Sequence, residues 1–262
     1  MKTKRRIFFV NCLQLLQNPW FYLCTVGVCI LAFFSIREYY QDFPGQDVYY
    51  YFNLFQGLSM YKKLLAVFAA VPFAASFCSD WNCQYIKPVI VRCGLKRYTV
   101  SKVAACFLSA FATVFLGLCL FILLFLTKQP LYPDQPASEF ALPPFGSLVK
   151  SPIPALYILA EVCVLSMACA LWAVVGLAIS AYIPNRFVAI ATPLIASYLL
   201  ERLTGYLPYF LDLYKLTNCS DVIGQGPLLS FGYFTLVFVG FSCLAGWAFH
   251  HQVKRRVRNE VV

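Results

Sequence analysis

The sequence predicts an all-α polytopic membrane protein with six transmembrane helices, an N-terminal interfacial helix and both termini in the cytoplasm. The first observation is composition, since 61% of the 262 residues are hydrophobic and only 12% are charged. A soluble domain carries about 25% charged residues, and one small core cannot hide this much apolar surface. The second observation is a series of apolar runs, several of them near the roughly 20 residues that a helix needs to cross a bilayer.

Residues 4–17 are the first predicted element, an amphipathic helix. Its polar side chains fall on one stripe, which comprises Lys4, Asn11, Gln14 and Asn18. Apolar side chains cover much of the remaining surface, so we expect the helix to lie in the membrane interface. A cytoplasmic extension of the first span is the alternative. A cleavable signal peptide is not expected, because polar residues interrupt the early apolar stretch.

Six apolar runs follow this helix. We expect spans at about 20–36, 64–78, 103–127, 154–180, 187–200 and 231–250. The second and fifth are only about 15 residues long, which is roughly 22 Å of helix. They cross the membrane only if flanking residues join them, with Lys62 and Lys63 snorkelling outward from the second. Four spans with two re-entrant helices remain the alternative.

The distribution of charge favours six spans. This count places the N-terminus, the 79–102 segment, the 181–186 turn and the C-terminus on one side. That side then carries 14 of the 21 basic residues: Lys2, Lys4, Arg5, Arg6, Lys87, Arg92, Lys96, Arg97, Lys102, Arg186, Lys254, Arg255, Arg256 and Arg258. Positive charge marks the cytoplasmic side, so we expect a multi-pass protein of a bacterial plasma membrane. The net charge of +10 therefore indicates topology and lipid contact, and no nucleic-acid partner is expected.

The sequence contains few candidates for a catalytic, nucleotide-binding or metal-binding site. The sequence contains no G-x-x-x-x-G-K-[ST], H-E-x-x-H or G-x-S-x-G motif. Most of the 12 cysteines lie in spans, and none has the paired C-x-x-C spacing of a zinc site. We therefore expect no enzymatic activity, no metal and no cofactor in this chain.

Glu161 is the one clear acid within a predicted span. A carboxylate at such a depth costs about 3 kcal/mol on insertion scales. One interpretation places Glu161 on a substrate path or a subunit seam. The other is a snorkelling acid that is hydrogen-bonded to a neighbouring helix, and both stay open.

The 79–102 segment carries the strongest signal, because a connection between two spans needs only a few residues. Asp80 follows the second span and can cap a helix. Residues 85–91 have the pattern of a short amphipathic helix, and Gly94 suits a helix-ending αL position. Arg97, Tyr98 and Lys102 then anchor the third span. The segment is either a topology-setting loop that binds lipid headgroups or a docking helix for a cytoplasmic partner.

This arrangement resembles the membrane subunits of type-2 ABC exporters. In that family an acidic residue ends the second span, and a glycine-containing amphipathic stretch follows. A basic and aromatic element and a lysine then open the third span. Asp80, residues 87–94, Lys96-Arg97-Tyr98 and Lys102 match this pattern in order. The 201–230 connection is similar to the family's short helices that re-enter the outer leaflet, whereas loops 37–63 and 128–153 are longer than the family needs.

The resemblance implies an ABC transporter permease subunit without its motor. Segment 79–102 would be the coupling segment that docks on a separate cytoplasmic ABC ATPase, which binds ATP and Mg. The implied docking residues are Asp80, Trp81, Lys87, Arg92, Gly94, Arg97, Tyr98 and Lys102. Two permease subunits, identical or different, and two ATPases would export an amphipathic substrate such as a peptide, an antibiotic or a lipid-like molecule.

Two other functions fit a polytopic membrane protein. A secondary transporter or channel usually shows internal repeats or several charges within the membrane, and no convincing repeat is present. A non-transporting immunity or scaffold protein needs no ATPase partner. An intramembrane enzyme is disfavoured because no catalytic cluster lies in the spans.

Overall fold

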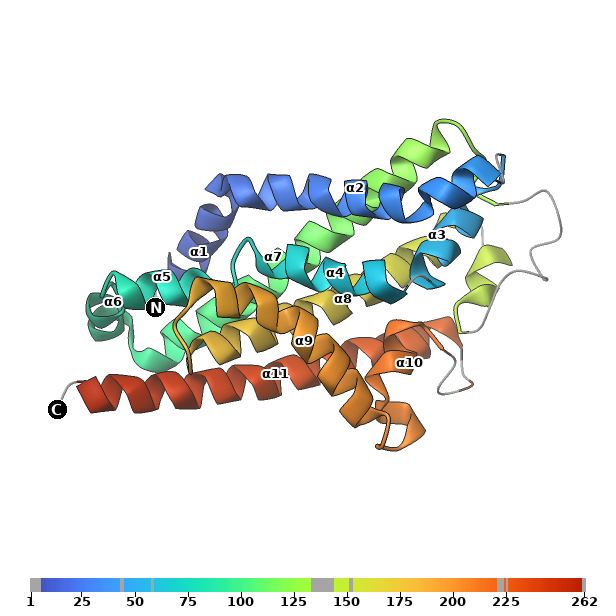
Figure 1. Ribbon diagram of the computed structural model, residues 1–262. Helices are drawn as coiled ribbons and strands as arrows, with labels where there is room; N and C mark the ends of the chain where they lie inside the picture. The colour runs from blue at the N-terminus through green and yellow to red at the C-terminus, as the bar shows by residue number, and fades with distance from the viewer. Residues whose placement is uncertain are drawn as a thin grey trace.

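The computed structural model describes residues 6–42, 45–57, 59–132, 144–150, 153–220, 224 and 226–260. Every regular element within these ranges is a helix, which confirms the all-α prediction. The elongated bundle is shown in Figure 1.

Five of the described helices are long and apolar enough to cross a membrane. They are α2 (Pro19–Asp42), α7 (Leu95–Leu126), α8 (Ala155–Ser180), α9 (Arg186–Thr204) and α11 (Pro227–Glu260). Such a set is typical of a multi-pass membrane protein. The helix α8 is apolar on all sides and forms the centre, where it packs against α4 (Ser59–Ala70), α7, α9 and α11.

The second predicted span is not one continuous helix. Over 64–78 the chain forms the end of α4, a turn at 71–75 and the start of α5 (Ser76–Asn82). Pro72 lies in this turn, and a proline has no backbone N–H to donate to a helix. The side chain of Asn18 donates a hydrogen bond of 2.9 Å to the carbonyl of Pro72. The break is therefore stabilised by a polar contact from the start of α2.

Pro193 behaves differently, because α9 continues through it. The helix has 19 residues and is longer than the predicted span 187–200. The helices that contain the third and sixth predicted spans also extend beyond them, since α7 starts at Leu95 and α11 at Pro227. With 19 residues, α9 is therefore longer than the fifth predicted span that it contains.

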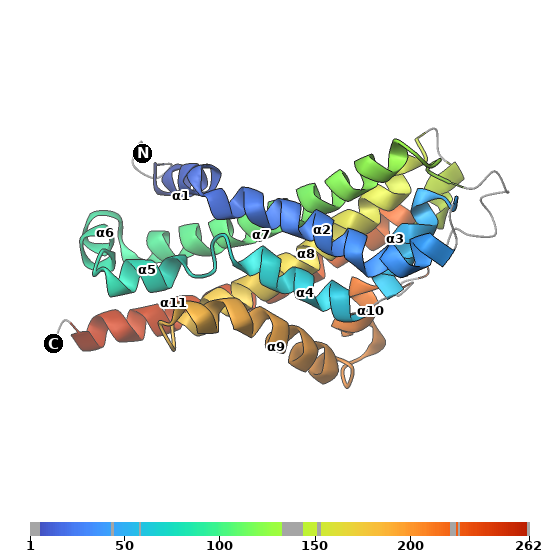
Figure 2. The same cartoon turned by 45° about the horizontal axis from the view of Figure 1, so that its top comes forward.

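The two ends of the bundle differ in what they carry. Figure 2 shows α1 (Arg6–Gln17), α5, α6 (Ile86–Cys93) and the C-terminal end of α11 gathered at one end. The opposite end carries α3 (Val48–Gly57) and η2 (Gly146–Lys150), with η3 (Tyr209–Leu211) and α10 (Leu213–Thr217) following the end of α9. The basic 79–102 segment and the described end of the chain therefore lie together, as the charge pattern predicts.

The N-terminal helix exists, although the predicted polar stripe is divided: Asn11 faces the protein, whereas Gln14 is exposed. Residues 4 and 5 of the predicted element lie outside the described residues. Asn11 is buried and donates a hydrogen bond of 2.8 Å to Ser101 of α7. The exposed side chains of α1 are mainly apolar and include Phe8, Phe9, Val10, Leu13 and Leu16. This outward apolar face suits contact with lipid.

Small residues allow the long helices to approach one another. A Cβ atom at Gly176 would lie 2.7 Å from the carbonyl oxygen of Ala189 in α9. A Cβ atom at Gly117 would lie 2.6 Å from Val28 in α2. Glycine is therefore required at these two crossings, as is common where helices pack inside membranes.

Candidate functional site

The coupling segment, residues 79–102, folds into three helical pieces. It contains the end of α5, the whole of α6 and the first two turns of α7. Gly94 joins α6 to α7 with φ +80° and ψ 143°. The positive φ confirms that glycine suits this position, but this ψ lies outside the αL region. Gly94 therefore makes a sharp reversal between two helices and does not form the predicted αL cap.

Three of the predicted docking residues meet inside the protein. Asp80 lies within α5 and does not cap it, because the N-cap is Ala75. Its Oδ2 accepts a hydrogen bond of 2.7 Å from the Tyr98 hydroxyl and lies 2.8 Å from the Lys102 ammonium. Lys102 also lies over the ring of Phe73, 5.2 Å from its centroid. This buried contact fixes α5 and the 71–75 turn against α7.

Trp81 connects the coupling segment to the C-terminal helix. Its ring stacks on Phe77 at 5.8 Å, and the guanidinium of Arg256 lies 5.1 Å from its centroid. Arg256 in turn donates a hydrogen bond of 2.5 Å to the carbonyl of Tyr182, in the turn between α8 and α9. Phe77 also packs edge-on against Phe249 of α11 at 5.3 Å. The segment is thus held by α7 and α11, and Arg256 joins α11 to this turn.

The remaining predicted docking side chains point outward. Lys87, Arg92 and Arg97 are exposed, while Ile86 is buried against the bundle. Val91, on α6, is 86% exposed. The segment therefore combines an anchored interior with exposed basic side chains, and α5 and α6 lie at one end of the bundle (Figure 2).

Sequence reasoning missed the residues that anchor this segment. Phe73, Phe77 and Arg256 were not among the predicted docking residues. The i, i+4 spacing of Phe77 and Trp81 is a usable signal, because such residues share a helix face. Arg256 is 175 positions from Trp81 by subtraction, so no local pattern could indicate their contact.

A second group of polar side chains lies between α4, α8 and α9. We call Lys62, Lys63, Glu161, Glu201 and Asn218 the polar cluster. Lys63 forms an ion pair with Glu201 of α9, and Lys62 donates a hydrogen bond of 2.5 Å to Asn218. Both lysines are buried, so the prediction that they snorkel outward is wrong.

Glu161 occupies the α8 side of the polar cluster. Its carboxylate accepts a hydrogen bond of 3.3 Å from Gln56 of α3 and also meets the Tyr157 hydroxyl. The Tyr157 hydroxyl lies 3.1 Å from that of Tyr49. Glu161 is therefore bonded to side chains of its own chain, on its own helix and on the neighbouring α3.

A small cavity of about 20 Å³ opens beside the two lysines and Glu201. A site that holds one water needs about 10–15 Å³. The cavity thus suits one water molecule among polar partners and is too small for a substrate in this conformation.

No metal centre is formed by the described side chains, since no group of three or more His, Cys, Asp or Glu residues among them is placed to hold an ion. Comparisons of the chain with family models, with curated proteins and with solved structures return no match. The function is therefore inferred from the residues and their geometry.

Proposed function

We propose that this chain is the membrane permease subunit of a type-2 ABC exporter and that α6 seats on a separate cytoplasmic ATPase. The observation that carries the proposal is the construction of the coupling segment. Its basic outer surface is exposed, while Asp80 and Lys102 anchor it inside the bundle. A partner that moved α6 would therefore move membrane helices with it.

The proposed topology has six crossings. The five membrane-length helices supply five of them, and α4 with α5 supplies the sixth by returning the chain from the α3 end to the α6 end (Figure 1). The positive charge near α6 and the C-terminus assigns that end to the cytoplasm. In this topology the chain is a multi-pass protein of a bacterial plasma membrane, with both termini inside.

In this mechanism the chain itself performs no chemistry. The partner ATPase binds ATP and Mg and hydrolyses the nucleotide. When the ATPase moves α6, residues of this chain cause the membrane helices to tilt. Tyr98 and Lys102 link α5 to α7 through their contacts with Asp80, so that the two helices move together. Trp81 and Arg256 pass this movement to α11 and to the turn between α8 and α9.

Export requires a path, which we place where two copies or two related subunits meet. The exposed apolar surfaces of α2 and α9 flank α4 on the same side of the bundle (Figure 2). The polar cluster, with Lys62 and Lys63 on α4 and Glu161 on α8, is buried beside α4 and would face this path when the helices tilt. An amphipathic cargo, such as a peptide, an antibiotic or a lipid-like molecule, fits a path with an apolar wall and few charges.

Charge reversal on the coupling segment tests the docking. The variant with Arg92→Glu and Arg97→Glu should lose co-purification of the ATPase, while membrane insertion persists, because both side chains are exposed. Lys128→Glu is the matched control, as Lys128 is exposed beyond the opposite end of α7. ATPase capture that survives in the double variant would contradict the docking.

The polar cluster favours a second candidate, a secondary transporter. Ionisable groups buried inside a membrane protein often mark ion or proton pathways, and the cluster holds two lysines and two glutamates. Vesicles that contain this chain alone separate the two functions. Substrate movement driven by an ion gradient, without ATP or an ATPase, would favour the second candidate.

A further inference from the structure

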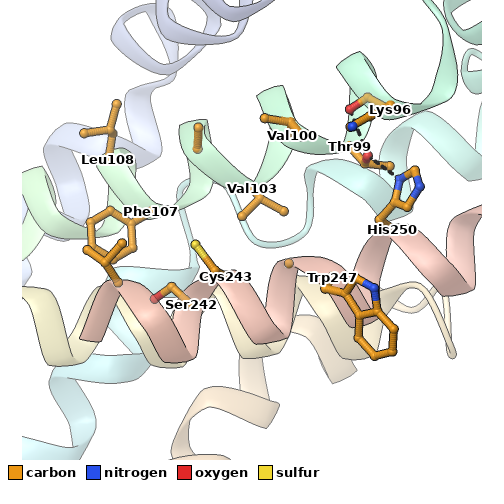
Figure 3. Close-up of a pocket in the computed structure, with 13 residues that line it drawn as sticks. Lys96, Thr99, Val100, Val103, Phe107, Leu108, Ser242, Cys243, Trp247 and His250 are labelled. Atoms are coloured by element: carbon orange, nitrogen blue, oxygen red, sulfur yellow. Dashed lines mark hydrogen bonds between the residues drawn. The ribbon is translucent and has the colours of Figure 1, made fainter. Parts of the chain in front are cut away.

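An apolar groove runs between α7 and α11; it begins beside the last residues of the coupling segment, and none of its lining residues belongs to the polar cluster. Figure 3 shows its lining, which includes Phe107, Leu108 and Trp247, and its volume is about 490 Å³. The two helices approach closely at its floor, where a Cβ atom at Gly246 would lie 3.0 Å from Val103. Small-molecule sites typically have volumes of about 300–1,000 Å³ and mostly apolar walls.

The length of the groove corresponds to one leaflet. On α7 its lining extends from Lys96 to Leu108, a distance of about 18 Å at the helical rise. Half of a hydrocarbon core measures about 15 Å. A single acyl chain that starts at the headgroup level would therefore fill the groove along its length.

Only one end of the groove is charged. Lys96 belongs to the lining, and Lys254 lies one helical turn beyond His250, which also lines the groove. The charges of both lysines act on the His250 ring. Thr99 and His250 join the two helices at this end through a contact of 2.8 Å (Figure 3). Among the described residues that line the groove, none is acidic.

We propose that this groove binds an anionic phospholipid of the leaflet that meets the coupling segment. One acyl chain lies between α7 and α11, and the phosphate lies between Lys96 and Lys254. The inference goes beyond the proposed export function and does not depend on it. A transmembrane helix of a second copy fits less well, because its apolar surface would cover the lysine end without neutralising it.

The test is native mass spectrometry of the purified full chain in mild detergent, with added dioleoylphosphatidylglycerol or dioleoylphosphatidylcholine. Each basic side chain near an anionic lipid is expected to contribute to binding, and two of them favour the anionic lipid by roughly thirtyfold in Kd. Lys96→Gln together with Lys254→Gln should bring the Kd of phosphatidylglycerol to that of phosphatidylcholine. Cys243→Phe, which fills the groove, should weaken the binding of both lipids.

Two matched control variants show whether the change in lipid affinity comes from the groove and its lysines. Leu244→Phe adds a ring at an exposed position of α11 outside the groove, and Lys128→Gln removes an exposed charge beyond the far end of α7. Both should bind lipid like the unchanged chain. Equal affinity for the two lipids, or equal losses in the control and groove variants, would overturn the proposal.

Two further outcomes would assign the groove to another ligand. Inorganic phosphate that displaces phosphatidylglycerol at millimolar concentration, with Cys243→Phe having no effect, would reduce the site to an anion site. Loss of a dimer in Cys243→Phe, with unchanged lipid binding, would make the groove a contact between copies. Either result would overturn the assignment to a phospholipid.

Discussion

Lys102 is a cationic side chain held almost entirely inside the bundle. Its side chain is 5% exposed and pairs with Asp80, whose side chain is 17% exposed. The rings of Phe73 and Tyr98 also lie within 6 Å of its ammonium group. Removing one partner of such a pair leaves the other charge buried without compensation. Replacing both Asp80 and Lys102 by apolar residues should therefore lower the free energy of unfolding less than replacing Lys102 alone.

Lys102→Met should lower the free energy of unfolding by about 3–5 kcal/mol, because Asp80 loses its counter-charge. The double variant with Asp80→Leu and Lys102→Met should recover part of this loss. Recovery is incomplete because the Tyr98 hydroxyl then loses its acceptor. Unfolding in mixed detergent micelles measures the three free energies.

Lys215→Met is the control for these variants, since Lys215 is 35% exposed and lies 3.9 Å from Asp212. Because the lysine is open to solvent and the two charged groups are this far apart, the pair is expected to contribute only about 0–1 kcal/mol. A double variant less stable than Lys102→Met would show that Asp80 and Lys102 do not act as a pair.

Asp47 gives the chain a pH dependence at the α3 end. Burial raises the pKa of its carboxyl, because water is removed from the charged form. Within the described ranges its Oδ2 has no hydrogen-bond partner. The unfolded chain releases this proton near pH 4, whereas the folded chain holds it to higher pH. The folded state therefore loses stability as the pH rises from about 4 through the raised pKa.

Asp47→Asn should remove this dependence, because an amide stays neutral and still accepts a hydrogen bond from the start of α3. The variant is expected to be more stable than the unchanged chain at pH 7 and equally stable near pH 3. Free energies of unfolding at the two pH values provide the measurement. A difference of the same size at both values would exclude titration of Asp47 as its cause.

At the scale of elements, hydropathy predicted those helices whose apolar run lies within their own sequence. The apolar runs of α7 and α8 were identified because each helix carries its own signal over many residues. The break at Pro72 was not identified, because its polar contact comes from the distant Asn18, which lies between α1 and α2. The first turns of α7 were assigned to a loop because Lys96, Arg97 and Lys102 lower the local hydropathy, although this helix begins before its apolar run.

Local sequence indicated which side chains of the 79–102 segment lie on its surface, but not which lie in its interior. Arg92 and Arg97 are exposed, and the docking role that the order of basic and aromatic residues suggested stays a prediction. The burial of Lys62 could not be predicted, because its partner Asn218 is 156 residues away in the sequence. A long-range partner decides whether a lysine near a span end points outward or inward, and a single sequence does not show that partner.

The crossing of α8 and α9 gives a prediction at the element scale. Gly176→Ala should destabilise the chain by about 1–3 kcal/mol, because the added methyl group must displace backbone at Ala189. Gly240→Ala is the matched control on α11, where a Cβ atom meets nothing within 4 Å. There the substitution should stabilise the helix by up to about 1 kcal/mol. Equal effects at the two glycines would contradict the close crossing.

At the scale of the whole molecule, the proposed topology requires that the two ends of the bundle face different compartments. The α6 end carries the coupling segment and the basic end of α11, and the opposite end carries α3 and η2. Reporter fusions at Ile90 of α6 and Leu148 of η2 should therefore give opposite locations, cytoplasmic and external. The same location at both positions would refute the six-crossing topology.

The central claim is that a cytoplasmic ATPase binds α6. A photo-crosslinker placed at Val91 tests this claim most directly. Val91 is 86% exposed on α6, and Tyr206, 85% exposed beyond the far end of α9, is the matched control. In intact cells of the native host, the crosslinker at Val91 should capture a nucleotide-hydrolysing protein, and the one at Tyr206 should not. Capture of lipid alone at Val91, or labelling of Val91→Cys by a membrane-impermeant thiol reagent from outside the cell, would contradict the claim.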